Sequence, residues 1–290
     1  MSNPFDGIYP ALLTPMDQDE KILIKEIKKM VKHLESFDFA GFYVGGSTGE
    51  GMIMSYDERK QVFKAVAEST ENNNIKLIAH IGAPSTKAAI DMGLYAKSLG
   101  YPVISAVAPY YYGFKTEEVK NYYKTIVNAV NLPFIIYNYP GASNFTLDTS
   151  AVKELFEDTR FIGIKHTTLD LFALERFRRA CPNISIYNGF DEVLLAGLSM
   201  GASGGIGSTY NIMPNTIIGI YNAFKKGDLE TAKSLQTKAN KVIDALIQCG
   251  VMNSEKYLLS KHGIKMGSCR HPFTPLTKDQ KIFLDTLELS

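Results

Sequence analysis

The sequence is poor in cysteine and holds no cluster of basic residues. Its three cysteines, Cys181, Cys249 and Cys269, are odd in number and far apart. Neither a disulfide framework nor a CxxC metal site is therefore expected, and a reducing compartment is favoured. The net charge is only +1. Without a basic patch, nucleic acid and membrane surfaces have no electrostatic reason to bind, so neither is expected as a partner.

Long hydrophobic runs are also missing. No apolar stretch approaches the roughly 20 residues that cross a bilayer as a helix. The first twenty residues contain no lysine or arginine and no long apolar core, both of which a secretory signal peptide would need. We therefore expect a cytoplasmic protein.

Motifs for metals and nucleotides are absent as well. The five histidines are dispersed and form no HxH or HExxH pair, so no metal site is expected. The glycine-rich stretches Gly45–Gly51 and Gly204–Ser208 match neither a Walker A loop nor GxGxxG. The second could hold a phosphate, as loops after the last strands of a barrel often do, but a narrow strand ending at Ser208 is the favoured interpretation. No cofactor is expected.

Short apolar segments alternate with amphipathic ones along most of the chain. Eight strand-then-helix units occupy residues 7 to 226, and their strands are apolar on both faces, as a parallel sheet covered by helices requires. Eight units without a dinucleotide fingerprint favour a closed (β/α)8 TIM barrel over an open doubly wound sheet. The expected strands are residues 7–13, 40–44, 75–81, 103–108, 134–137, 161–165, 184–187 and 202–206. The expected helices are residues 21–37, 55–69, 85–99, 116–130, 148–157, 171–180, 193–200 and 214–226.

The last part of the chain carries no further strand. Apolar residues recur there at helical spacing, from Leu229 through Ala239 to Leu246, which predicts a C-terminal helical extension. No linker or low-complexity segment separates it from the barrel. We expect one structural domain, in which a barrel of residues 1–226 is covered by helices of residues 227–290.

In a barrel of this class the chemistry lies on the loops after the carboxyl ends of the strands. Lys165 ends the sixth strand. A buried lysine is costly unless its charge is removed, and the unprotonated amine can attack a carbonyl group to form a Schiff base. The alternative is a lysine that only ends its strand and reaches out to water.

Two tyrosine positions also follow strands. Tyr137 ends the fifth strand and would lie beside Lys165, where a phenol can transfer protons. Because the chain has 16 tyrosines, a core residue with a satisfied hydroxyl is the alternative for any one of them. The run Tyr110–Tyr112 follows the fourth strand and could equally pack at a subunit contact.

The loop Gly45–Gly51 follows the second strand. Its glycines permit close approach of the backbone, and Ser47 and Thr48 offer hydroxyl and N–H donors to an anion. A small carboxylate suits this loop better than a polyphosphate, because the loop contains no lysine. A tight turn between strand and helix would explain the glycines equally well.

Three motifs in chain order carry a family resemblance: Gly45–Glu50, Tyr137–Pro140 and Gly163–Lys165. Together they resemble the pyruvate-dependent class I aldolases of the dihydrodipicolinate synthase/N-acetylneuraminate lyase family, over nearly the whole chain. The resemblance implies that Lys165 forms the Schiff base with C2 of pyruvate. It also implies that Ser47 and Thr48 hold the pyruvate carboxylate.

The same resemblance implies two further roles and an assembly. Tyr137 would be the proton-transfer residue. Tyr111 would be lent to the site of a neighbouring subunit, with Ser47 and Tyr111 forming a proton relay to Tyr137. The family is usually tetrameric, so a homotetramer built as a dimer of dimers is expected.

The stretches after the fifth, seventh and eighth strands favour one branch of the family. Dihydrodipicolinate synthases resemble one another in an arginine after the Tyr-Asn-x-Pro motif, which pairs with a substrate carboxylate. Residues 141–146 hold no cation here, and an unpaired buried carboxylate would be costly. Residues 187–192 and 204–211 instead look like the lyase motifs that bind a sugar chain. This likeness gives substrate-binding roles to Thr167, Gly189, Asp191, Glu192 and Ser208.

The expected activity is the reversible, metal-independent cleavage of sialic acid to N-acetylmannosamine and pyruvate through a Schiff base. Another pyruvate aldolase, such as a dihydrodipicolinate synthase, is the alternative among enzymes. A non-catalytic barrel that senses a keto acid or sialic acid is the alternative outside them. Tyr139 and residues 141–142 depart from the pattern of other lyases, which leaves the preferred sialic acid open.

Overall fold

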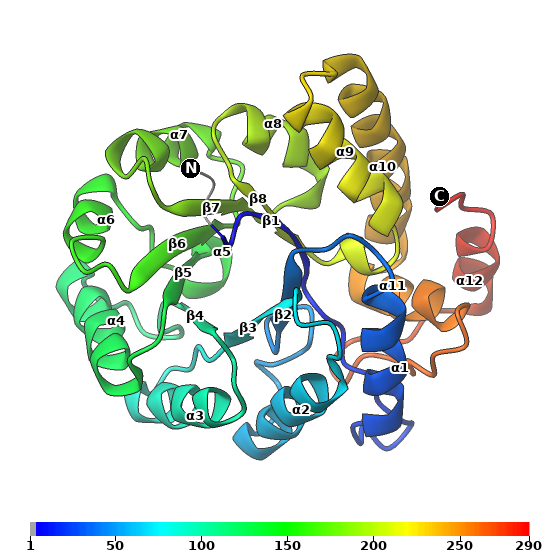
Figure 1. Ribbon diagram of the computed structural model, residues 1–290. Helices are drawn as coiled ribbons and strands as arrows, with labels where there is room; N and C mark the ends of the chain where they lie inside the picture. Colours follow the sequence, from blue (N-terminus) through cyan, green and yellow to red (C-terminus); the bar gives the residue numbers. More distant parts are fainter. Residues whose placement is uncertain (1–3, 290) are drawn as a thin grey trace.

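Eight parallel strands form the centre of the computed structural model, which describes residues 4–289 (Figure 1). From β2 to β8 each strand pairs with the next along the chain, and β8 pairs with β1. The strands are β1 (Gly7–Pro10), β2 (Gly41–Val44), β3 (Lys76–His80), β4 (Val103–Val107), β5 (Phe134–Asn138), β6 (Phe161–His166), β7 (Ser185–Asn188) and β8 (Gly204–Gly207).

Backbone hydrogen bonds outside the ladders close the ring between β1 and β2. The N–H of Leu12 donates to the Tyr43 carbonyl (2.9 Å), and the N–H of Ala40 donates to the Ile8 carbonyl (3.0 Å). Ala11 and Tyr43 also form an isolated parallel bridge. The expected (β/α)8 TIM barrel is therefore confirmed.

Helices form an outer ring around the strands (Figure 1). They are α1 (Ile24–Leu34), α2 (Tyr56–Ser69), α3 (Thr86–Ser98), α4 (Thr116–Val130), α6 (Thr149–Leu155), α7 (Leu171–Ala180), α8 (Leu194–Ser199) and α9 (Pro214–Lys225). A short helix, α5 (Pro140–Ser143), follows β5 inside this ring (Figure 1). Short 3-10 turns, η1 (Asp191–Val193) and η2 (Thr209–Asn211), follow β7 and β8. A capping box begins α2: the Ser55 hydroxyl accepts from the Glu58 N–H, and the Glu58 carboxylate accepts from the Ser55 N–H.

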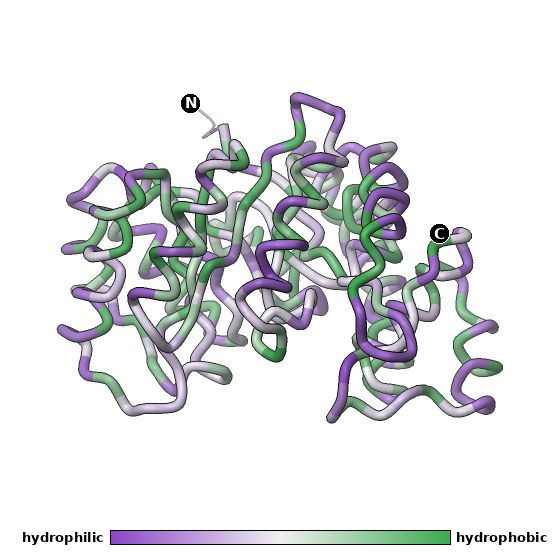
Figure 2. The backbone as a smooth tube through the Cα atoms, turned by 90° about the horizontal axis from the view of Figure 1, so that it is seen from below, coloured by the Kyte–Doolittle hydropathy of each residue, from purple (hydrophilic) through white to green (hydrophobic). Residues whose placement is uncertain are grey.

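Two apolar layers hold the barrel together. Successive side chains of a strand point to opposite faces. On β5, Ile135 and Tyr137 pack in the barrel interior, whereas Phe134 and Ile136 pack in the layer between strands and helices. Figure 2 shows hydrophilic and hydrophobic residues alternating along the outer helices, as expected of helices with one face on the sheet and one in water.

Three more helices follow the barrel: α10 (Leu229–Cys249), α11 (Val251–Ser260) and α12 (Lys278–Leu284). Helix α10 lies against α9, and α11 contacts both α10 and η2 (Figure 1). The buried face of α10 includes Ala239, Val242 and Leu246. Truncating a buried leucine such as Leu246 to alanine costs about 2–5 kcal/mol, so this packing is a substantial part of the stability.

Some expected boundaries lie elsewhere in the structure. Strand β1 ends at Pro10, not at residue 13, because its ladder partner β8 ends at Gly207, which is paired with Pro10. The loop expected at residues 138–146 contains α5, which begins at Pro140, where the missing N–H does no harm. The helix expected at residues 193–200 is α8, Leu194–Ser199, and the 3-10 turn η1 directly precedes it. Of the expected ranges 1–226 and 227–290, residues 1–3 and 290 lie outside the described residues. In the described part of the chain, no helix is both long enough and apolar enough to span a membrane.

Candidate active site

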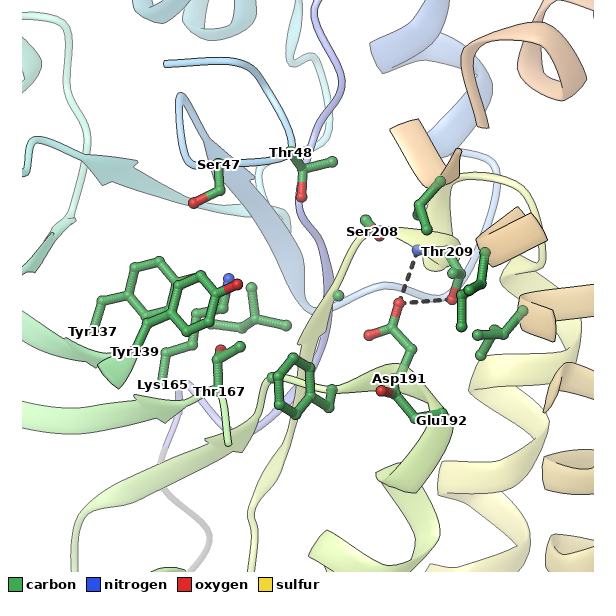
Figure 3. A pocket seen from close by; sticks show the side chains of 17 residues that line it. Ser47, Thr48, Tyr137, Tyr139, Lys165, Thr167, Asp191, Glu192, Ser208 and Thr209 are labelled. Carbon is green, nitrogen blue, oxygen red and sulfur yellow. Dashed lines mark hydrogen bonds between the residues drawn. The ribbon is translucent and has the colours of Figure 1, made fainter. Parts of the chain in front are cut away.

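The ends of five strands and the loops after them surround a cavity of about 310 Å³ (Figure 3). These strands are β2, β5, β6, β7 and β8, so the cavity lies at the carboxyl end of the barrel. Most residues expected from the sequence line it: Ser47, Thr48, Tyr137, Lys165, Thr167, Gly189, Asp191, Glu192 and Ser208. Their convergence from separate loops makes this cavity the candidate active site.

Lys165 is the amine of the site. Its side chain leaves β6 toward the barrel interior and is 5% exposed. The Nζ atom lies 4.3 Å from the centre of the Tyr137 ring and 4.4 Å from that of the Tyr43 ring. Burial lowers the pKa of Lys165 to about 7, and the carboxylate of Asp191 partly offsets this effect. A large fraction of the amine is therefore unprotonated and nucleophilic at neutral pH.

Tyr137 is the register partner of Lys165 on β5. Burial raises the pKa of its phenol, and the nearby hydroxyls of Thr167 and Ser47 partly oppose that rise. The ring of Tyr139 stacks against that of Tyr137 with centroids 5.7 Å apart (Figure 3). At neutral pH the phenol is protonated, so it can move a proton only by passing its own to a neighbour.

The loop after β2 presents donors to the cavity. Gly45 has φ +72°, a conformation that a side chain would strain. Among residues 4–289, no acceptor reaches the backbone N–H of Ser47 or Thr48. These N–H groups and the two hydroxyls form a set of donors that suits an anion such as a carboxylate.

A buried ion pair anchors that loop from behind. Glu50 lies in this loop, and Lys256 lies on α11. Both side chains are fully buried, and Oε1 of Glu50 is 2.5 Å from Nζ of Lys256. The second carboxylate oxygen of Glu50 accepts a hydrogen bond from the Arg270 N–H (2.6 Å). Local sequence patterns do not reveal this pair, because two charges 206 positions apart form no local pattern.

Asp191 lies across the cavity from Lys165 (Figure 3). Its Oδ2 atom accepts hydrogen bonds from the Thr209 N–H (2.9 Å) and hydroxyl (2.7 Å). Its Oδ1 atom has no partner in the described chain. Burial raises the pKa of Asp191 to about 6, although the hydrogen bonds from Thr209 lower it. At neutral pH the side chain is thus largely a carboxylate with one oxygen free to accept from a ligand hydroxyl.

Helix α10 holds the turn that carries Asp191 and Glu192. The side-chain amide of Gln236 donates to the Asp191 carbonyl (3.1 Å), and that of Asn240 donates to the Glu192 carbonyl (3.0 Å). The apolar spacing of this helix predicts packing alone. The two amides, four residues apart on one face, were the signal that could have revealed the contact.

Glycines leave space beside the polar groups. A Cβ atom on Gly189 would lie 1.9 Å from Oγ1 of Thr167, and one on Gly207 would lie 1.7 Å from Oδ1 of Asp191. Any larger residue at either position would displace a polar atom that faces the cavity. Lys165 is the only cationic side chain among the described residues that line it. No group of three or more His, Cys, Asp or Glu side chains within residues 4–289 is placed to hold a metal ion.

Tyr111 does not line the cavity. Its side chain is 83% exposed, and its φ of +83° is unfavourable for any residue with a side chain. Within the chain its ring packs edge-on against that of Tyr112, with centroids 5.0 Å apart. The structure therefore brings together the other expected site residues and leaves Tyr111 on the surface.

A parallel barrel with a buried, nucleophilic lysine beside a tyrosine defines a class I aldolase, a carbon–carbon lyase that works through a Schiff base. The chain belongs to the dihydrodipicolinate synthetase family, whose model matches residues 4–287. The resemblance to the pyruvate-dependent class I aldolases is confirmed by this match.

Individual relatives are similar along nearly their whole length. N-acetylneuraminate lyase of Rhizobium meliloti (strain 1021) is 42% identical over 269 residues, which cover 92% of this chain and 89% of the relative. N-acetylneuraminate lyase of Shigella boydii serotype 4 (strain Sb227) is 41% identical over 278 residues, covering 95% and 93%. Among solved structures, CdNal of Clostridium difficile in complex with mannosamine superposes with a TM-score of 0.95 at 36% identity over 97% of each chain.

Proposed function

We propose that this protein is an N-acetylneuraminate lyase, which cleaves sialic acid reversibly into N-acetylmannosamine and pyruvate. The observation that carries the proposal is the buried amine of Lys165 in the cavity, beside Tyr137 and across from Asp191. The names of relatives about 40% identical along the chain support the same activity.

Schiff-base formation is the first chemical step. The neutral amine of Lys165 attacks the C2 ketone of the open-chain substrate, and water leaves to give a protonated imine. Burial of Lys165, which lowers its pKa, makes the amine available for this step. The donors of Ser47 and Thr48 hold the C1 carboxylate, which places C2 over Lys165.

Carbon–carbon cleavage follows from the iminium group. Tyr137 takes the proton of the C4 hydroxyl as its own proton passes into the relay of Ser47 and the partner subunit's Tyr111, which returns a proton through Tyr137 to C3 in the next step. The C3–C4 bonding electrons move to C3 and the iminium nitrogen, which gives an enamine and the aldehyde of N-acetylmannosamine. Protonation at C3 and addition of water then release pyruvate and restore the Lys165 amine.

The other half of the cavity recognises the sugar chain. The free oxygen of Asp191 and the carboxylate of Glu192 accept hydrogen bonds from substrate hydroxyls, and the Gly189 carbonyl, Thr167 and Ser208 add further contacts. A dihydrodipicolinate synthase is the second candidate. The cavity favours it less, because the cation needed by its second carboxylate is absent from the described lining.

We also propose a cytoplasmic homotetramer in which Tyr111 completes the partner's site. The exposure of Tyr111 and its positive φ support this assignment, because backbone strain persists only where surrounding contacts impose it. Mixing an inactive K165M variant with an inactive Y111F variant should restore activity if the residue crosses between subunits. One site of each mixed dimer then has both residues intact. A mixture that stays inactive would contradict the proposed crossing of Tyr111 between subunits.

Product analysis tests the activity itself. Purified protein incubated with N-acetylneuraminate should release N-acetylmannosamine and pyruvate in equal amounts, with and without a chelator. Release of neither product while sialic acid still binds would support a sensor. Condensation of pyruvate with aspartate semialdehyde in place of sialic acid cleavage would support the synthase.

A further inference from the structure

Glu255 is a buried acid that the proposed reaction does not use. It lies on α11, is wholly buried, and directly precedes Lys256. Consecutive helical residues point about 100° apart. Lys256 reaches Glu50, behind the loop that carries Ser47, whereas Glu255 lies near the Ser208 side chain, after β8. One turn of α11 therefore supports two different loops of the active site.

The carboxyl of Glu255 is poorly satisfied. Both its oxygens are buried and lack a close, well-directed hydrogen bond in the described chain, although Ser208 is near enough to act on them. No cation pairs with it, because Lys256 is engaged by Glu50 and by the Ser268 carbonyl. A buried carboxylate without a partner costs several kcal/mol, so the group is favoured in its protonated form. Burial raises the pKa of Glu255 to about 8, which the Ser208 hydroxyl lowers and Asp191 raises.

We infer that Glu255 is a specificity-determining positioning residue, which donates the hydrogen bond of its protonated carboxyl to Ser208 and so sets how that hydroxyl meets the substrate's sugar chain. This inference rests on the proposed function. A protonated carboxyl occupies an acceptor lone pair of Ser208 and leaves the serine's O–H free to donate into the cavity. An ionised carboxyl can only accept. It would turn the Ser208 O–H away from the cavity and present lone pairs to the substrate instead.

None of the ionisable groups described around Glu255 changes its charge in the same pH range as Glu255. Asp191, from η1, is already largely ionised at neutral pH, with a pKa raised by burial to about 6. Burial raises the pKa of the neighbouring Cys269 thiol to about 12, so it stays neutral. Lys256 and Glu50 form their own pair on the other side. Between pH 7 and 9, Glu255 is the group of this cluster whose charge changes.

The variants Glu255→Gln and Glu255→Leu separate this role from a structural one. The glutamine keeps a donor toward Ser208 at every pH, and the leucine keeps none. We expect the KM for N-acetylneuraminate of E255L to rise about fivefold at pH 7, the effect of one lost hydrogen bond, with the thermal midpoint unchanged or raised. The KM of wild type should rise relative to that of E255Q as the pH passes about 8. An unchanged KM in E255L, or a wild-type to E255Q ratio that is flat with pH, would overturn the inference.

A spectroscopic readout needs no activity. Wild type at pH 7 should show the infrared C=O stretch of a buried protonated carboxyl, lost above pH 8 and absent from E255Q. Glu230→Gln, at an exposed position of α10, is the matched control and should keep the band. If the band is present but no lyase activity is found, the proposed function fails while the protonation state stands. If the band is absent from wild type, the inference fails whatever the activity.

Discussion

Lys165 and Tyr137 face each other across paired strands, with the lysine Nζ atom 4.3 Å from the centre of the tyrosine ring. The aromatic ring excludes water from the amine, and burial keeps the phenol protonated. Two groups with displaced pKa values in contact are a common sign of an acid–base site.

The rate at which pyruvate is trapped on Lys165 should depend on pH. Because the folded-state pKa of Lys165 is lowered to about 7, the amine is protonated and unreactive below that value and neutral above it. The rate of borohydride-trapped adduct formation with pyruvate should rise with pH, reach half its maximum near pH 7 and level off above pH 8. A midpoint near 10, the value of a solvated lysine, would contradict the buried-amine account.

Tyr137→Phe should separate binding from cleavage. Loss of the phenol removes a proton-transfer group, so kcat for sialic acid cleavage should fall by about 10²–10⁴-fold. Adducts of pyruvate with Lys165 should still form. The matched control is Tyr139→Phe, which removes a phenol from the stacked neighbouring ring and should change kcat by a few-fold at most. An equal fall of kcat in both variants would contradict a proton-transfer role for Tyr137.

Asp191→Asn should weaken binding of the sugar chain and lower the pKa of the Lys165 amine. The amide keeps the shape but replaces a free acceptor by a donor, so KM for sialic acid should rise about 10- to 100-fold. Asp191 raises the pKa of Lys165, so the midpoint of pyruvate trapping should move below that of wild type. A midpoint that moves upward would show that the charge of Asp191 does not reach Lys165.

Breaking the buried Glu50–Lys256 pair behind the Ser47 loop should lower the free energy of unfolding strongly. Lys256→Met leaves the Glu50 charge buried without its partner, which should cost about 3–5 kcal/mol in urea unfolding. The matched control, Lys233→Met, breaks an exposed pair and should cost less than about 1 kcal/mol. The double variant E50Q/K256M should recover much of the loss. If K256M and K233M unfold alike, the pair does not anchor the loop.

Local sequence patterns were sufficient for the barrel and for the cavity-facing residues. Alternating strand and helix periods indicated eight units, and the rule that chemistry follows strand ends selected Ser47, Tyr137 and Lys165, which the folded chain brings to one cavity. The capping box of Ser55 and Glu58 set the start of α2. These features depend on neighbours within a few residues, which is why the sequence alone reveals them.

The supports of the site could not be predicted in the same way. Lys256 and Glu255 stand in an amphipathic helix, and nothing local distinguishes a buried charge from a solvated one. Their partners, Glu50 and Ser208, lie far away in the chain, and only tertiary packing brings them together. The two-amide contact from α10 to the turn at Asp191 has the same long-range origin.

The most direct test of the central claim is to reduce the protein with borohydride in the presence of pyruvate and to map the modified peptide by mass spectrometry. The account expects one adduct, on Lys165, absent from K165M, in a protein that releases N-acetylmannosamine from sialic acid. Modification of another lysine, or active protein with no adduct, would contradict the Schiff-base mechanism.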